Sequence, residues 1–254
     1  MLFTRYVALG DSVSIDLYPA LDAGETDVAV NLERHADAGA VAPLGAASLF
    51  YRNDEARWPA EQGDDLVSRY PGITLHNLAE DGASIGDVFG SQLAQLEETD
   101  EPTLVTLTAG GNDLLSAVAN RPRASLLDAI ANDVADAYEF LLDAIRRAVP
   151  NGLIITATIY DPSDGSGVIP GMFDELGELP LAVLERLNKH IRRLTSGTPR
   201  TALADIHEHF LGHGASSTDD ERWYWRRSLI EPNAAGASEI RTLWRQVLDE
   251  HNPD

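Results

Sequence analysis

Three short segments carry residue types that suit cleavage of an ester by a serine nucleophile. In Gly10-Asp11-Ser12, a serine directly follows an apolar run. Later apolar runs lead into Gly82 and into Gly110-Gly111-Asn112-Asp113. Glycine lets a backbone N–H approach a ligand closely, and an asparagine amide is a neutral donor. With the N–H of Ser12 itself, Gly82 and Asn112 supply the groups that an oxyanion hole requires.

Each of these segments also has an ordinary interpretation. Ser12 with Asp11 is typical of a turn or a helix start, and both later segments are typical of glycine turns. The argument rests on their combination, because three successive apolar runs end in a nucleophile and two donors, in that order. Phosphate binding is disfavoured, since the chain has no GxxxxGK[ST] motif and the first run lacks GxGxxG.

The elements that must position these residues are five short apolar runs separated by segments of helical period. Their continuous hydrophobicity is typical of strands buried on both faces. The runs are Phe3–Leu9, Ile73–Leu78, Thr103–Thr108, Leu153–Ile159 and Thr201–Ile206. Helices are predicted over Ser125–Val149, Leu181–Leu194 and Ala234–Leu248. Strands alternating with helices predict a parallel α/β sheet, which binds ligands at the carboxyl ends of its strands.

Two stretches break this alternation, one from residue 16 to about 58 and one over about 212–230. Loops this long inside one domain are usually functional lids or insertions, so both are predicted to shape the substrate pocket. The second contains the aromatic cluster Trp223-Tyr224-Trp225. No repeat or linker indicates a second domain, and residues 1–254 are predicted to form a single one.

The three segments and the order of elements resemble the SGNH (GDSL-type) hydrolase family. Gly10-Asp11-Ser12 matches its nucleophile block, the Gly82 segment its second block, and Gly110–Asp113 its GxND block. The resemblance implies a three-layer α/β fold with a flavodoxin-like, five-stranded parallel sheet and helices on both faces. It also implies carboxylic ester hydrolysis, with Ser12 as nucleophile and Gly82 and Asn112 as oxyanion donors.

The chain departs from the family at its fourth block, an Asp-x-x-His-Pro-Asn pattern before the last helix. Here Pro232, Asn233 and Gly236 keep the frame, but Glu231 stands at the histidine position and Ser228 at the aspartate position. The general base is therefore the open question of this sequence.

Three hypotheses remain for the base. Glu231 could act alone, although its ordinary pKa lies about 2 units below that of imidazole, unless burial raises it. His213 could act as base with Glu231 orienting its ring, because the flanking glycines permit an unusual loop path. Of these hypotheses, the pairing of His213 with Glu231 is the one that the sequence favours. The third hypothesis is a degenerate site, in which the protein only binds a ligand.

The amino-acid composition limits the classes of partner and of chemistry that are expected for this chain. The chain of 254 residues has no cysteine and a net charge of −22, so disulfides, thiolate chemistry and a nucleic-acid surface are disfavoured. We see neither an 18-residue apolar span nor a secretory signal, which favours a cytoplasmic location without a membrane span. A small-molecule ester is the expected partner, without cofactor or metal; acyl transfer to another acceptor and the oligomeric state stay open. The acidic surface fits either a halophilic protein or arginine-rich codon usage.

Overall fold

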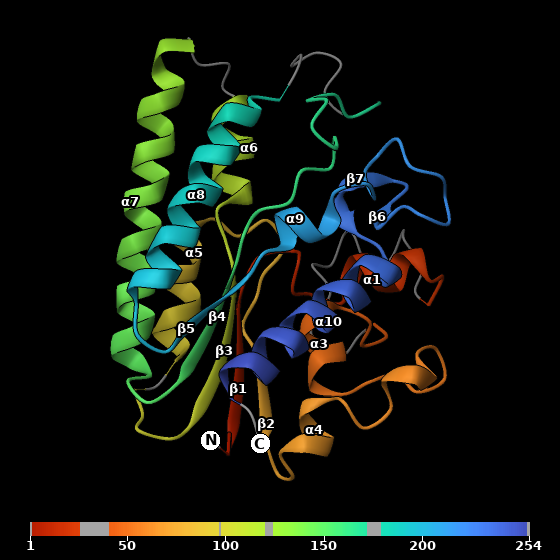
Figure 1. The fold of residues 1–254 in the computed structure, drawn as a ribbon, viewed down its shortest axis with the longest axis vertical. Helices are drawn as coiled ribbons and strands as arrows, with labels where there is room; N and C mark the ends of the chain where they lie inside the picture. The colour runs from red at the N-terminus through yellow and green to blue at the C-terminus, as the bar shows by residue number, and fades with distance from the viewer. Residues whose placement is uncertain (1, 26–40, 97, 120–123, 172–178, 253–254) are drawn as a thin grey trace.

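The computed structural model describes residues 2–25, 41–96, 98–119, 124–171 and 179–252. A parallel five-stranded sheet with the order β2-β1-β3-β4-β5 runs through its middle (Figure 1). The strands are β1 Arg5–Gly10, β2 Thr74–Asn77, β3 Thr103–Thr108, β4 Leu153–Ala157 and β5 Thr201–Ala204. All five predicted strands are present, and the order is the flavodoxin-like one. The predicted fold class is confirmed.

Burial along the strands follows their place in the sheet. Every residue of Thr103–Thr108 in β3 is buried, as expected for a strand covered on both faces. In contrast, residues of β2 alternate between exposed and half-buried, because this strand lies at the sheet edge. The prediction that each run is buried on both faces is therefore wrong for β2.

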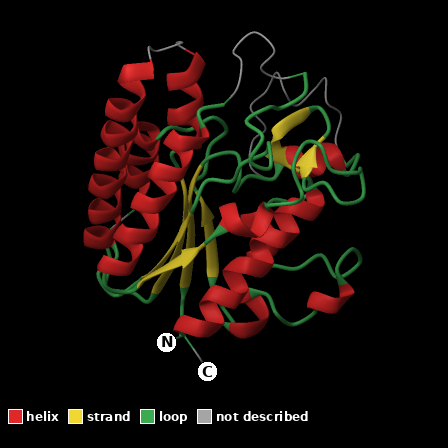
Figure 2. Ribbon diagram, turned by 45° about the horizontal axis from the view of Figure 1, so that its top comes forward, coloured by secondary structure: helices red, strands yellow, loops and turns green. Residues whose placement is uncertain are grey.

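Helices cover both faces of the sheet, which completes three layers (Figures 1 and 2). One layer consists of α5 Ile85–Asp87, α6 Gly111–Ala119, α7 Ala124–Ala148 and α8 Leu181–Gly197. The other consists of α1 Leu17–Asp22, α3 Ala46–Tyr51, α4 Leu66–Arg69 and α10 Ala234–His251. Short turns over Pro59–Glu61, Val88–Gln92 and Leu93–Gln95 and the helix α9 Ile206–Phe210 connect these elements.

Each layer buries its own apolar cluster against the sheet. On the α10 side, Trp244 is fully buried, and its ring lies 5.7 Å from that of Phe50 in α3. On the α7 side, the helix α7 itself contributes Tyr138, Leu141 and Ile145, which recur at helical spacing and are fully buried against the sheet. The two clusters hold the strands rigidly, so the carboxyl end of the sheet is a firm platform for side chains.

The two stretches predicted as long loops contain regular structure. The first includes α1 and α3, while its residues 26–40 lie outside the described ranges. The second leads into an antiparallel hairpin of β6 Tyr224–Trp225 and β7 Ser228–Pro232. Among the described residues, the structure shows no helix long and apolar enough to cross a membrane.

Candidate active site

Ser12 lies in the turn that follows β1, at the carboxyl end of the sheet. Its side chain is nearly buried, with 7% exposed. The Oδ1 atom of Asp11 accepts a hydrogen bond from the Val13 N–H at 3.2 Å, and the Asp11 carbonyl accepts one from the Ser14 N–H at 3.1 Å. The Ser14 hydroxyl in turn lies 3.0 Å from that of Thr108 at the end of β3. The turn is thus fastened both to itself and to the neighbouring strand.

The residue before this turn is held by Gln92, which the sequence analysis did not single out. The Gln92 side chain is fully buried. Its Oε1 accepts a hydrogen bond from the Gly10 N–H at 2.8 Å, and its Nε2 donates one to the Gly10 carbonyl at 2.7 Å. A Cβ on Gly10 would lie 2.0 Å from the Thr108 carbonyl oxygen, so only glycine fits here. Gln92 therefore fixes the last backbone unit before the Asp11-Ser12 turn.

Glu231 reaches the same pocket as Ser12 from the β6–β7 hairpin. The hairpin is tied to the start of α10 by Asn233, whose Nδ2 donates to the Arg222 carbonyl at 2.7 Å and whose Oδ1 accepts from the Gly236 N–H at 2.8 Å. The Tyr160 hydroxyl donates to the Ile230 carbonyl at 2.5 Å. These contacts explain why the Pro-Asn-x-x-Gly frame places residue 231 above the sheet.

The Glu231 carboxyl is buried and incompletely solvated. Glu231 as a residue is 7% exposed, and its Oε2 has no hydrogen-bond partner among the residues that the structure describes. Burial raises the pKa of Glu231 to about 8, an effect opposed by its interaction with the Ser12 hydroxyl and reinforced by the negative charges of Asp81 and Asp11. The carboxylate is therefore a far stronger base than an exposed glutamate.

A second buried carboxyl belongs to Asp11, immediately before Ser12 in the chain. Burial raises the pKa of Asp11 to about 7, although hydrogen bonds from the Val13 N–H and the Thr108 side chain oppose the shift. Ser12 thus follows one carboxyl of raised pKa along the chain and interacts with the other, that of Glu231. Repulsion between them explains part of the raised pKa of Glu231.

Of the two predicted oxyanion donors, Asn112 lines the pocket with Ser12. One N–H of its Nδ2 donates to the Ala83 carbonyl at 3.0 Å, which leaves the second N–H for another acceptor. Gly82 directly precedes Ala83 but is exposed and does not line the pocket. The Asn112–Ala83 bond nevertheless holds the Gly82 segment at the rim.

His213, predicted as the base, is not brought to Ser12 or Glu231. Its ring stacks on that of Trp223, with centroids 3.5 Å apart, and its Nδ1 lies 2.7 Å from the Glu221 carbonyl oxygen. It does not line the pocket that Ser12 and Glu231 share. The pairing of His213 with Glu231 therefore gains no support from this pocket and stays a prediction, because the His213 imidazole packs on Trp223.

The pocket beside Ser12 is predominantly apolar, with a cavity volume of about 120 Å³. Its walls come from the turn after β1, the start of α6, the loop after β4, the start of α8 and the hairpin. Among the described residues, no three or more metal-ligating side chains come together. That hydrolysis needs no metal stays a prediction.

Comparisons with known proteins agree with this arrangement. Residues 8–238 match the model of the GDSL-like lipase/acylhydrolase family. An extracellular lipase from Streptomyces rimosus superposes with a TM-score of 0.53 at 21% identity, over 98% of this chain and all (100%) of that one. Phospholipase A1 from Streptomyces albidoflavus gives a TM-score of 0.57 at 22% identity, over 98% and 99% of the two chains.

A family 3 carbohydrate esterase from Clostridium thermocellum gives a TM-score of 0.53 at 15% identity, over 98% of this chain and 96% of the other. No curated protein sequence matches the chain. The structural neighbours establish the fold, and the family model spans most of the sequence. The protein thus belongs to the GDSL-like lipase/acylhydrolase family and is a hydrolase of the esterase and lipase type.

Proposed function

We propose that the protein hydrolyses carboxylic esters through an acyl-enzyme on Ser12, with Glu231 as its general base. The observation that carries the proposal is the buried Glu231 carboxyl beside the Ser12 hydroxyl, with a pKa of about 8. A base of that strength exceeds free imidazole, whose pKa is about 6.5. Burial thereby compensates for the weak basicity of an ordinary glutamate.

In the acylation step, the ionised Glu231 takes the proton of Ser12 as Oγ attacks the ester carbonyl carbon. The negative charge that develops on the carbonyl oxygen is stabilised by the Asn112 Nδ2 and the Ser12 N–H, whereas Gly82 does not line the pocket. Protonated Glu231 then gives its proton to the leaving alcohol oxygen, and the acyl group stays on Ser12. This uses the one N–H of Asn112 that is not bound to Ala83.

In the deacylation step, Glu231 takes a proton from a water molecule, which attacks the acyl carbon. The tetrahedral intermediate collapses, Ser12 regains a proton from Glu231, and the carboxylic acid leaves. Only about a tenth of Glu231 is ionised at pH 7 if its pKa is about 8, so we expect activity to increase in mildly alkaline solution.

A non-catalytic member of the same fold, which only binds its ligand, is the competing function. It is favoured by the protonation of Glu231 below about pH 8, since a carboxylic acid donates hydrogen bonds rather than removing protons. The two functions differ in the reactivity of Ser12, which the binding protein does not need.

Intact mass after treatment with a fluorophosphonate separates these functions without a guess about the substrate. We expect one adduct on the wild type at pH 9, none on Ser12→Ala, and strongly slowed labelling of Glu231→Gln. Glu239→Gln is the matched control, because Glu239 is bound to His209 at 3.1 Å and does not line the pocket. A folded wild type without any adduct would favour the binding protein.

A further inference from the structure

One wall of the pocket at Ser12 is built from aliphatic side chains and leads away from the catalytic groups. This wall is lined by Leu114 and Leu115 of α6 and by Leu181, Val183 and Leu184 of α8. The α8 residues belong to the first turn of that helix. Among the described residues, no lysine or arginine lines the cavity. A phosphate or another anionic headgroup would find no cationic partner there.

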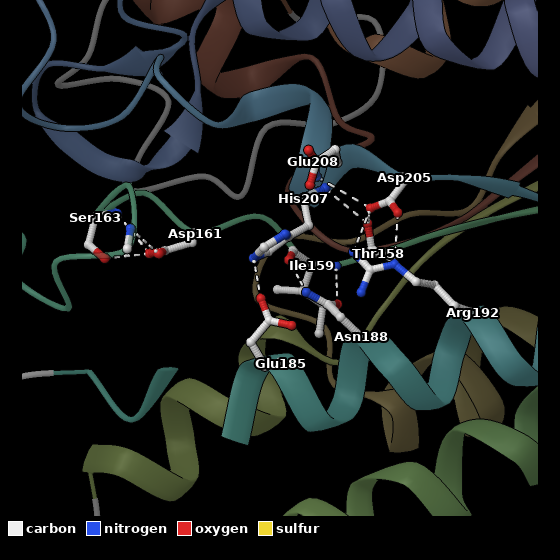
Figure 3. A network of polar contacts seen from close by, with 11 residues as sticks. Thr158, Ile159, Asp161, Ser163, Glu185, Asn188, Arg192, Asp205, His207 and Glu208 are labelled. Atoms are coloured by element: carbon white, nitrogen blue, oxygen red, sulfur yellow. Dashed lines mark hydrogen bonds and ion pairs between the residues drawn. The ribbon is translucent and has the colours of Figure 1, made fainter. Parts of the chain in front are cut away.

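Polar side chains that line the cavity near β4 and β5 are already bound to other protein groups (Figure 3). The Thr158 hydroxyl donates to Asp205 at 2.8 Å and accepts from the His207 N–H at 2.9 Å. The Oδ1 atom of Asp161 accepts from both the N–H of Ser163, at 2.9 Å, and its hydroxyl, at 2.5 Å. These residues shape the cavity but have their main hydrogen bonds satisfied.

The same holds nearer the nucleophile. The Tyr160 hydroxyl donates to the Ile230 carbonyl, and the Thr108 hydroxyl is engaged by the Ser14 hydroxyl and the Asp11 N–H. Of the lining side chains, Ser12, Asn112 and Glu231 are the polar ones that remain to meet a ligand. Most of the other side chains of the wall are apolar.

This distribution disfavours a sugar ring in the cavity. Its hydroxyl groups would lose water without gaining hydrogen-bond partners, which is unfavourable for each unsatisfied group. A hydrocarbon chain has no such groups, and its transfer into the cavity is favourable.

The position of Glu231 decides which half of the ester occupies this wall. As the general acid, Glu231 must lie next to the leaving alcohol oxygen. It comes from the β6–β7 hairpin, whereas the aliphatic wall comes from α6 and α8 on the other side of the sheet end (Figure 1). The alcohol therefore leaves on the hairpin side, and the acyl chain points towards α6 and α8.

The volume of the cavity limits the length of the acyl chain that it can hold. The cavity of about 120 Å³ is close to the apolar cavity of about 150 Å³ that holds one benzene molecule in another protein. We propose that the α6–α8 side of this pocket is an acyl subsite for unbranched aliphatic acids of about four to eight carbons. The proposal rests on the proposed function and specifies its substrate class.

The first test is the kcat/KM series of 4-nitrophenyl acetate, butyrate, hexanoate, octanoate and palmitate at pH 9. We expect an increase of about fourfold per methylene group as the cavity fills, followed by a decrease at palmitate. Leu184→Trp fills part of the cavity at this wall, so the ratio of kcat/KM for octanoate to kcat/KM for acetate should decrease at least tenfold. Leu126→Trp is the matched control, because Leu126 is exposed on α7, outside the cavity, and should keep the wild-type ratio.

The second test does not need catalysis: calorimetric titration of Ser12→Ala with octanamide and with acetamide, both uncharged. Binding of octanamide at least tenfold tighter than acetamide supports the acyl subsite even if the wild type cleaves no ester. If octanamide binds tighter but the wild type cleaves no ester, the proposed function is wrong and the acyl subsite is still supported. Conversely, ester cleavage with acetate preferred over octanoate, or equal binding of the two amides, overturns the acyl subsite and leaves the proposed function intact.

Discussion

The Ser12 turn and the Glu231 hairpin supply the two groups that we propose react in one pocket, but they are held in different ways. Ser12 follows a central strand whose last residue, Gly10, is bound on both backbone groups by the buried Gln92. Glu231 lies on a two-stranded hairpin outside the main sheet, and within the described part of the chain its Oε2 has no hydrogen-bond partner. The nucleophile is fixed by satisfied hydrogen bonds, whereas the basicity of the glutamate results from unsatisfied ones.

This difference has a physical reason. A nucleophile needs accurate placement, which a network of satisfied hydrogen bonds in a packed core provides. A carboxylate gains basicity when its charged form loses water and donors, so full satisfaction of Glu231 would weaken it as a base. The site therefore combines a stable part and a destabilised part, and changes to each should have separate consequences.

The largest expected effect comes from the reacting groups themselves. Ser12→Ala should reduce kcat/KM by at least about 10⁴-fold, and Glu231→Gln by about 10²–10⁴-fold, because one removes the nucleophile and the other the proton acceptor. Initial rates at pH 9 on 4-nitrophenyl butyrate measure both. If Glu231→Gln keeps more than half of the wild-type rate, Glu231 is not the base.

The same Glu231→Gln substitution should stabilise the fold in alkaline solution. The unfolded glutamate ionises near pH 4.5 and the folded one near 8, so the folded state holds an extra proton between these values and wild-type stability decreases as the pH rises through this window. At pH 9 the variant should be more stable by up to roughly 5 kcal/mol, with little difference at pH 4. Urea unfolding at the two pH values measures this, and a pH-independent difference would contradict the raised pKa.

Gln92→Leu should destabilise the fixed part. The substitution leaves the buried Gly10 N–H without its Gln92 partner, which costs about 1–3 kcal/mol, while the Gly10 carbonyl keeps its hydrogen bond from the Glu80 N–H at 3.1 Å. We also expect kcat to decrease at least tenfold at temperatures where the variant remains folded. Gln95→Leu is the matched control, because Gln95 lies in the next turn and its Nε2 bonds only the local Ser91 carbonyl. Equal unfolding midpoints for the two variants would argue against the role of Gln92.

A smaller effect is expected from substitution of Asp81. Its carboxylate accepts hydrogen bonds from the Tyr18 hydroxyl, and its negative charge raises the pKa of Glu231. Asp81→Asn removes a negative neighbour, so Glu231 should ionise at lower pH. The rising limb of kcat/KM, expected near pH 8 in the wild type, should move down by up to about one pH unit. A limb that stays in place or moves upward would be inconsistent with this charge effect.

The smallest effect is expected for His213→Ala. Its imidazole stacks on Trp223 and bonds the Glu221 carbonyl, so its loss should change kcat/KM by no more than about threefold. Fluorophosphonate labelling and hydrolysis at pH 7 and pH 9 measure this directly. A loss of 10²-fold or more in a folded variant would restore the hypothesis that His213 is the base.

Sequence patterns predicted the fold and the Ser12 side of the site because these depend on local order. Five apolar runs became five parallel strands, and residues that follow β1 and β3 meet because parallel strands end at one edge of the sheet. The edge position of β2, the helices within residues 16–58 and the β6–β7 hairpin escaped this reasoning. These features depend on how segments distant in the sequence pack against one another, and local sequence patterns do not contain that information.

The sequence by itself therefore determined the α/β class, the family blocks that contain Ser12 and Asn112, and the presence of Glu231 where the family pattern has a histidine. Only the tertiary structure decided the rest. It buries Glu231 beside Ser12 and so raises the pKa of that carboxyl, it turns His213 onto Trp223, and it brings Gln92 to Gly10. Basicity, stacking and backbone satisfaction depend on neighbours that are distant along the chain, and folding alone brings those neighbours together.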